Sequence, residues 1–239
     1  MCIEVRNLTK LYASQKALDN LTFKTGSNHI IGFLGPNGAG KSTTMKILTG
    51  ILSPTEGYVS VDGVDIRKNP IKAKSQIGYL PENNPLYLDM YVREILAYEA
   101  GIHHLNNIEE RINEVIRLTG LEEEQHKKIS KLSKGYKQRV GLAMAIIHDP
   151  KVLILDEPTT GLDPNQILEI RNLIKTLSIN KTVLLSTHIM QEVDAICDEI
   201  VVLHKGQLKA HFLKTDQDLK YPGYSTEDIF VRLTTAESL

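Results

Sequence analysis

The sequence predicts an α/β fold built on a parallel sheet. From Lys151 onward, short apolar segments typical of strands alternate with segments of helical spacing, the order that β-α-β units produce. A glycine-rich stretch at 35–40 follows an apolar segment and precedes a helical pattern, as in many sheets of this class. The 239 residues are 41% hydrophobic and 24% charged, a composition that argues against a disordered chain.

The first third of the chain is predicted to form short strands joined by turns. Apolar residues alternate or cluster in these segments, and Asp62-Gly63 is a turn pair that favours a hairpin. The strands are expected at 3–8, 18–23, 29–34, 58–61, 64–66 and 77–80. After Lys41 the spacing becomes helical, with Met45, Leu48 and Ile51 expected on one face. Asn69-Pro70 is typical of a helix start.

The remainder divides into a helical part and an alternating part. Residues from about 81 to 147 are mostly helical in pattern. Strands are then expected at 152–155, 182–185 and 200–203, and helices at 167–177, 190–197 and 226–233. The chain shows no internal repeat, so any binding unit should occur once per chain.

Charge and cysteine content narrow the classes of function. Lysine and arginine total 28 against 29 acidic residues, and this balance favours no nucleic-acid partner. Cys2 and Cys197 are far apart in sequence, as expected for free thiols in a reducing cytoplasm. The apolar segments are short, so any passage through a membrane is expected from another chain.

The strongest motif is the segment from Gly35 to Ser42, which matches the P-loop pattern between a strand and a helix. Glycines let backbone N–H groups surround phosphate oxygens, and the helix start adds positive partial charge. Lys41 should reach the β- and γ-phosphates and Ser42 should ligate Mg²⁺. A chance glycine-rich turn is the weaker alternative. The expected nucleotide-binding residues here are Gly35, Pro36, Asn37, Gly38, Ala39, Gly40, Lys41, Ser42 and Thr43.

Two acids follow the apolar segment 152–155, in a Walker B pattern. Asp156 is expected to hold the Mg²⁺ shell, and Glu157 can polarise the attacking water. A buried strand with an exposed acidic tip is the structural alternative, but it is weak beside the P-loop.

The segment 132–139 lies 24 residues before Asp156 and precedes a helical pattern. It resembles the signature motif, usually LSGGQ, of ATP-binding-cassette (ABC) proteins, from which it departs at Lys134 and Tyr136. Ser133 and the Gly135 amide can donate to a phosphate at a helix start. The resemblance adds Ser133, Lys134 and Gly135 to the expected nucleotide contacts.

The resemblance implies a P-loop NTPase fold for the whole chain. One ABC ATPase domain would span 1–239, with a RecA-like parallel-sheet core and an N-terminal antiparallel β subdomain in 1–82 and 148–239. The helical subdomain that carries the signature would be inserted at 83–147. These boundaries are approximate expectations of the resemblance.

The resemblance also implies roles for isolated residues. Thr160 to Asp163 matches the D-loop, His188 the switch histidine that contacts the γ-phosphate, and Tyr12 the aromatic that stacks on adenine. Glu82 occupies a position that is usually glutamine, where its oxygen can still bind Mg²⁺. The expected catalytic residues are Glu157, His188 and Lys41, and the expected Mg²⁺ ligands are Ser42, Asp156 and Glu82.

The segment Gly78 to Leu96 resembles the ATP-binding subunits of ABC-2 and gliding-motility exporters. The expected protein is therefore an ATPase subunit that closes with a second cassette around two Mg-ATP and drives a membrane permease from the cytoplasmic face. The transported substrate, the direction of transport and the permease are not encoded here, and homodimer and heterodimer both fit.

Two other classes of function remain as alternatives. The first is a soluble cassette ATPase that acts on nucleic acid or ribosomes. The basic residues near the signature could form a nucleic-acid patch, a solvated face or a surface that attracts the nucleotide bound by a partner subunit. These residues are Lys127, Lys128, Lys131, Lys134, Lys137 and Arg139. A P-loop kinase or GTPase lacks support, and Val183 stands where a guanine-recognition motif needs aspartate.

Overall fold

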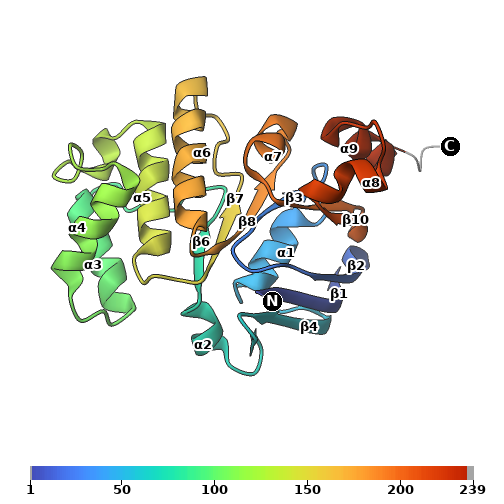
Figure 1. Cartoon of the computed structure of the whole chain (residues 1–239). Coiled ribbons are helices and arrows are strands. Elements are labelled where there is room, and N and C mark those ends of the chain that lie inside the picture. The colour runs from blue at the N-terminus through green and yellow to red at the C-terminus, as the bar shows by residue number, and fades with distance from the viewer. Residues whose placement is uncertain (1, 236–239) are drawn as a thin grey trace.

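The structure is a computed structural model that describes residues 2–235, in two sheets with helices around them (Figure 1). Met1 and residues 236–239 of the expected domain lie outside the described residues. The strands are β1 Ile3–Tyr12, β2 Gln15–Lys24, β3 Ile30–Leu34, β4 Glu56–Val61, β5 Val64–Asp65, β6 Ile77–Leu80, β7 Val152–Asp156, β8 Thr182–Thr187, β9 Glu199–His204 and β10 Gln207–Leu213. The α-helices are α1 Lys41–Leu48, α2 Pro70–Lys74, α3 Val92–Ile102, α4 Ile108–Thr119, α5 Lys134–Ile146, α6 Pro164–Ser178, α7 Met190–Ile196, α8 Gln217–Lys220 and α9 Thr226–Thr235, with short 3₁₀ helices η1 Ile129–Lys131 and η2 Lys214–Asp216.

The larger sheet has the order β10-β9-β3-β8-β7-β6, and all neighbouring pairs are parallel except β10 with β9. All residues of β3 and of β7 are buried, because both faces of the sheet are covered. Since the strands run in one direction, the segments that follow β3, β7 and β8 leave the sheet at the same edge. This edge is where α/β sheets bind their ligands, and it brings together the P-loop, the two acids and His188.

The smaller sheet is antiparallel, in the order β2-β1-β4-β5. The expected hairpin at Asp62-Gly63 is confirmed, because both residues have positive φ values of 47° and 74° and β4 pairs with β5. Apolar side chains of this sheet and of α1 form one core with one face of the larger sheet. The other face of the larger sheet packs against α3, α4, α5, α6, α7 and α9.

One expectation about the elements was wrong, and one strand was missed. Ile51 does not continue the α1 face but is 62% exposed. The helix ends at Leu48, and Gly50 has a φ of +67°, a conformation that closes helices. Strand β10, which pairs with β9 at the edge of the larger sheet, was not expected.

Helices α3, α4 and α5 pack on one another at one end of the molecule (Figure 1). They lie within the expected helical subdomain 83–147, whose boundaries remain a prediction. Helix α5 also contacts β6, so the helices are joined to the sheet by packing as well as by the chain. Within residues 2–235, no helix is both long and apolar enough to cross a bilayer.

A pair of histidines joins the helices to the sheet. The rings of His103, at the end of α3, and His148, between α5 and β7, stack with centroids 3.7 Å apart. His148 Nε2 lies 3.0 Å from the Ile77 carbonyl oxygen at the start of β6, where only a protonated nitrogen can donate. Its Nδ1 is buried without a hydrogen-bond partner. Burial, followed by the neighbouring His103, lowers the pKa of His148 from 6.5 to about 4.

The free energy of unfolding should therefore depend on pH through His148. The unfolded chain takes up the proton at a higher pH than the folded chain, so the His148 contribution is complete above about pH 6.5 and is lost as the pH falls toward 4. Because the site is only partly buried, we expect a loss of roughly 1–3 kcal/mol. His148→Gln, whose amide can still donate to Ile77, should remove this part of the pH dependence in thermal-denaturation curves. The exposed His126→Gln is the control, and an equal loss of acid sensitivity in both variants would contradict the assignment.

Candidate functional site

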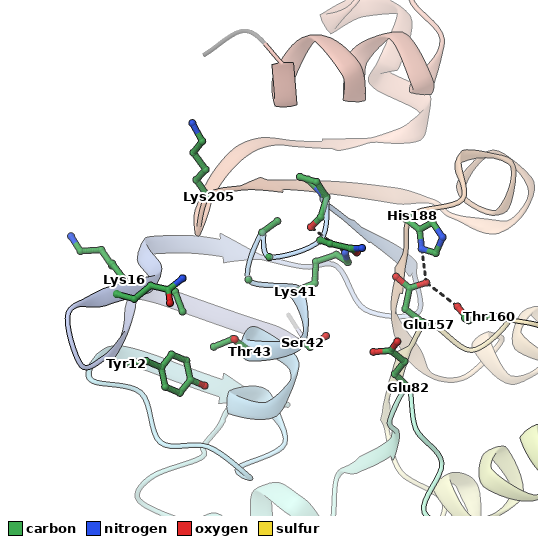
Figure 2. Close-up of a pocket in the computed structure, with 17 residues that line it drawn as sticks. Tyr12, Lys16, Lys41, Ser42, Thr43, Glu82, Glu157, Thr160, His188 and Lys205 are labelled. Atoms are coloured by element: carbon green, nitrogen blue, oxygen red, sulfur yellow. Dashed lines mark hydrogen bonds and ion pairs between the residues drawn. The ribbon is translucent and has the colours of Figure 1, made fainter. Parts of the chain in front are cut away.

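A cavity of about 700 Å³ lies at the edge where the parallel strands end (Figure 2). Seventeen residues line it: twelve were expected as nucleotide, metal or catalytic contacts, and a thirteenth, Thr160, was expected only as part of the D-loop. The expected residues that line it are Tyr12, Pro36, Asn37, Gly38, Ala39, Gly40, Lys41, Ser42, Thr43, Glu82, Glu157 and His188. Glu82, Glu157 and His188 lie on the side of the cavity opposite Tyr12, with Lys41 and Ser42 between them (Figure 2).

The P-loop forms because its glycines allow both positive φ and close contact. Gly38 and Gly40 have φ values of +80° and +104°, and a Cβ at Gly40 would lie 2.6 Å from Leu18 Cδ2. A Cβ at Gly35, which is buried, would lie 2.7 Å from the Leu203 carbonyl oxygen. The loop therefore packs closely on its neighbours, while Gly38 faces open space.

Lys41 is buried at the start of α1, with 7% of its surface exposed. Its Nζ donates to the Gly35 carbonyl oxygen at 2.7 Å and to that of Pro36 at 3.5 Å. Among the described residues it has no acidic partner within ion-pair distance. A buried ammonium held only by carbonyl oxygens is suited to an anion such as a phosphate.

The two acids at the end of β7 have different environments. Asp156 is 2% exposed and does not line the cavity, and its Oδ1 accepts a hydrogen bond from Ser186 Oγ at 2.5 Å. Glu157 has a φ of +52°, which is uncommon for a residue with a side chain. Its amide donates to Ser186 Oγ at 3.0 Å, and the strained backbone directs its carboxylate into the cavity.

Glu157 contacts one residue of its own loop and one residue of the loop after β8. Its Oε2 lies 2.9 Å from His188 Nδ1 and accepts a hydrogen bond from Thr160 Oγ1 at 3.2 Å (Figure 2). The His188 side chain is 56% exposed and that of Glu157 only 11%. A carboxylate, a histidine and a P-loop lysine therefore meet around one cavity, the arrangement needed to bind a phosphate and activate water beside it.

A family model described as "ABC transporter" matches residues 18–160, more than half of the chain. The chain belongs to the ABC transporter family. The bacitracin transport ATP-binding protein BcrA of Bacillus licheniformis is 41% identical over 211 residues, 86% of this chain and 68% of that protein. This ABC protein is accordingly an ATP-binding and ATP-hydrolysing subunit, and the expected P-loop NTPase fold is confirmed.

Two solved structures resemble the subunit closely. One, described as an ATP-binding subunit of an ABC transporter, has a TM-score of 0.88 and 32% identity, covering 98% of this chain and 99% of that one. The other is the ATP-binding cassette MJ0796, a dimer in a post-hydrolysis state bound to ADP and Pi. It has a TM-score of 0.80 and 25% identity, and covers 88% of this chain and 98% of that one.

The signature residues of this ABC subunit lie apart from the cavity. Ser133 is the N-cap of α5, where its Oγ accepts a hydrogen bond from the Tyr136 amide at 3.3 Å. Neither Ser133 nor Gly135 lines the cavity, and Lys134 lines an adjoining hollow of about 320 Å³. A single chain therefore does not bring Ser133 and Gly135 to its own P-loop.

The basic residues near the signature are partly neutralised. Lys127 forms an ion pair with Glu124 at 2.8 Å and Arg139 with Glu169 at 2.6 Å. Arg139 also donates to the Thr119 carbonyl oxygen, so it stabilises the helical part. The six residues are therefore not one uniformly free basic surface, although an electrostatic role toward a partner's nucleotide remains a prediction.

Sequence reasoning missed four residues that line the cavity: Gln15, Lys16, Ala17 and Lys205. They lie at the start of β2 and in the turn between β9 and β10. No motif marks them, and their positions depend on how the two hairpins pack beside the P-loop. Tyr12, expected between two strands, is the last residue of β1, and the residue is 46% exposed and lines the cavity.

Proposed function

We propose that this ABC subunit uses its cavity to hydrolyse Mg-ATP and thereby drives an exporter in the membrane. The observation that carries this proposal is the meeting of Lys41, Glu157 and His188 around one cavity. The nearby Tyr12 ring is exposed and offers an apolar face for adenine. A relative of this chain is named as a bacitracin transport protein, which supports a role in transport. The ABC-2 exporter type rests on the resemblance of the segment Gly78 to Leu96.

The residues present fit Mg²⁺. Ser42 and Glu82 line the cavity, and Asp156 ends the adjacent strand β7. Hydroxyl and carboxylate oxygens are the ligands that this cation prefers. When bound, Mg²⁺ neutralises charge on the phosphate oxygens. The hydrogen bond from Ser186 to Asp156 fixes one carboxylate oxygen, so Ser186 would orient this ligand.

Three residues would act on the substrate directly. Lys41 would move from the loop carbonyls to the phosphates, and the P-loop amides would hold the phosphate oxygens. Glu157 would accept a proton from the attacking water, with Thr160 and His188 orienting its carboxylate. His188, which is exposed beside Glu157, would also contact the γ-phosphate.

The second cassette would complete the site. Ser133 and Gly135 do not line the cavity of their own chain, and the similar cassette MJ0796 forms a dimer. In this proposal, the signature of one subunit donates to the phosphates bound by the other. ATP would then stabilise the closed dimer over the open state, and hydrolysis would release it.

The permease would bind near the segment that follows Glu82. Large hydrophobic side chains are exposed there, and Tyr87 and Tyr98 pack edge to face with centroids 6.2 Å apart. Exposed apolar groups of this size mark protein contacts. The exposed residues are Tyr87, Leu88, Tyr91, Tyr98 and Ile102. Such a contact would place the subunit on the cytoplasmic face of the membrane, and co-purification of a polytopic membrane protein with the full chain tests it.

Lys41→Ala should weaken binding of Mg-ATP by about 10- to 100-fold, the range expected for loss of a hydrogen-bonded charge. A fluorescent ATP analogue titrated against the full chain measures this change. Lys16→Ala is the matched control, because Lys16 lines the same cavity but is exposed and paired with Asp19. Equal affinities of Lys41→Ala and wild type would contradict the phosphate role.

A further inference from the structure

A buried carboxylate lies behind the site and has no part in the roles described above. Glu192, on α7, is only 1% exposed. Burial of a charged carboxylate is costly unless hydrogen bonds replace its hydration. The partners of Glu192 therefore indicate what its burial achieves.

Two threonine hydroxyls satisfy this carboxylate. Thr159 Oγ1 donates to Oε1, and Thr187 Oγ1 donates to Oε2 at 2.6 Å. Both threonines are buried, with 2% and 0% of their surfaces exposed. Each carboxylate oxygen thus holds a different segment of the chain.

These two segments carry the proposed catalytic pair. Thr159 follows Glu157 by two residues, in the loop that leaves β7, and Thr187 ends β8 directly before His188. Thr187 Oγ1 also accepts a hydrogen bond from the Ile189 amide at 3.1 Å, which fixes the backbone on the far side of His188. Glu192 therefore connects the two loops through buried hydrogen bonds. On the cavity side of the same loops, Glu157 Oε2 lies 2.9 Å from His188 Nδ1.

The carboxylate forms an ion pair with one arginine, but without a hydrogen bond to it. Among the described residues, the cation paired with Glu192 is Arg171, whose NH2 nitrogen is 3.8 Å from Glu192 Oε1, too far for a hydrogen bond. Arg171 Nε is buried without a hydrogen-bond partner. The carboxylate is oriented toward the two loops, although this leaves part of its counter-ion unsatisfied.

We propose that Glu192 is a positioning residue for ATP hydrolysis, which holds the loops after β7 and β8 so that Glu157 and His188 stay in hydrogen-bond contact. This inference rests on the proposed roles of Glu157 and His188. Glu192 touches neither ATP nor the attacking water. It acts by fixing the distance between two groups whose geometry controls the rate.

Three variants of the full chain test this role: Glu192→Gln, Thr159→Val and Thr187→Val. Each keeps the volume of the side chain and removes one hydrogen bond or the charge that strengthens both. We expect kcat for ATP hydrolysis to fall about 10- to 100-fold, with KM for ATP changed by less than about twofold, because the loops would be misplaced while the P-loop is intact. Amide hydrogen exchange should also accelerate in residues 157–162 and 187–189 of the nucleotide-free variants.

Glu199→Gln is the matched control. Glu199 is also buried, at 2% exposure, but lies at the start of β9, at the opposite end of the sheet, where it contacts His29 and His211. Its replacement should lower the melting temperature and leave kcat within about twofold of wild type, since it holds no catalytic loop. If Glu199→Gln lowered kcat as much as Glu192→Gln, loss of a buried charge alone would explain both, and the inference would be wrong.

A double-mutant cycle with His188→Ala separates positioning from simple stabilisation. If Glu192 acts through the Glu157–His188 contact, Glu192→Gln should lower kcat by less than about twofold in the His188→Ala background. An equal loss of kcat in both backgrounds would overturn this inference but not the proposed function. The same holds if Glu192→Gln keeps wild-type kcat while His188→Ala is inactive. Wild-type turnover of His188→Ala would overturn the proposed function, and this inference with it.

Discussion

Glu157→Gln should lower ATP hydrolysis by about 10²–10⁴-fold, the usual contribution of a general base. The substitution keeps the shape of a side chain that is 11% exposed and can retain hydrogen bonds to His188 and Thr160. It removes only the capacity to accept a proton from water. Steady-state phosphate release from the full chain measures the loss.

The same variant should accumulate a dimer in saturating Mg-ATP, since the step that opens the dimer is blocked. Size-exclusion chromatography with light scattering distinguishes monomer from dimer. Glu56→Gln makes the same chemical change at an exposed residue of β4 and should behave as wild type. Persistence of a monomer for Glu157→Gln would count against an ATP-closed dimer.

Ser133→Asp is expected to lower kcat by about 10²–10³-fold, comparable to removal of one donor that stabilises a transition-state charge. Aspartate keeps the N-cap of α5, where Ser133 accepts from the Tyr136 amide. It replaces a phosphate donor with an anion. The fold should therefore be retained, and the loss should come from repulsion of the partner's triphosphate.

The control for this charge is Ser130→Asp, three residues earlier and also exposed. The melting temperatures of both variants should stay close to wild type, and only Ser133→Asp should lose turnover. Gly135→Ala is less informative, because its Cβ would lie 2.7 Å from Gln166 Cδ in the same chain. If Ser133→Asp hydrolysed ATP normally, the signature would have no phosphate role.

The sequence predicted the sheet and the P-loop well because both depend on local signals. Five buried residues in β3 and in β7 produce continuous apolar segments, and glycines mark the loop. It failed at β10, whose residues alternate only weakly and include Lys209 and His211, because an edge strand needs less burial. Ile51 continues the apolar spacing of α1 in sequence but not in space, because Gly50 ends the helix before it.

The residues of the site likewise fall into those that a motif marks and those that only the packing brings to the cavity. Motifs identified Lys41, Glu157 and His188, and the parallel sheet brings them together. Lys16 and Lys205 carry no motif, since only the packing of their hairpins places them at the cavity. Glu192 could not be found from sequence either, because its role depends on hydrogen bonds to threonines 33 and 5 residues away.

The central claim is that each ATP is held between the P-loop of one chain and the signature of another. If the subunit forms a homodimer, mixing Lys41→Ala chains with Ser133→Asp chains tests the claim most directly. A dimer of either variant alone has no complete ATP site. About half of the randomly paired dimers contain both variants and one intact site, so turnover should return to about a quarter of wild type. A mixture that stays as inactive as the separate variants would contradict the shared site.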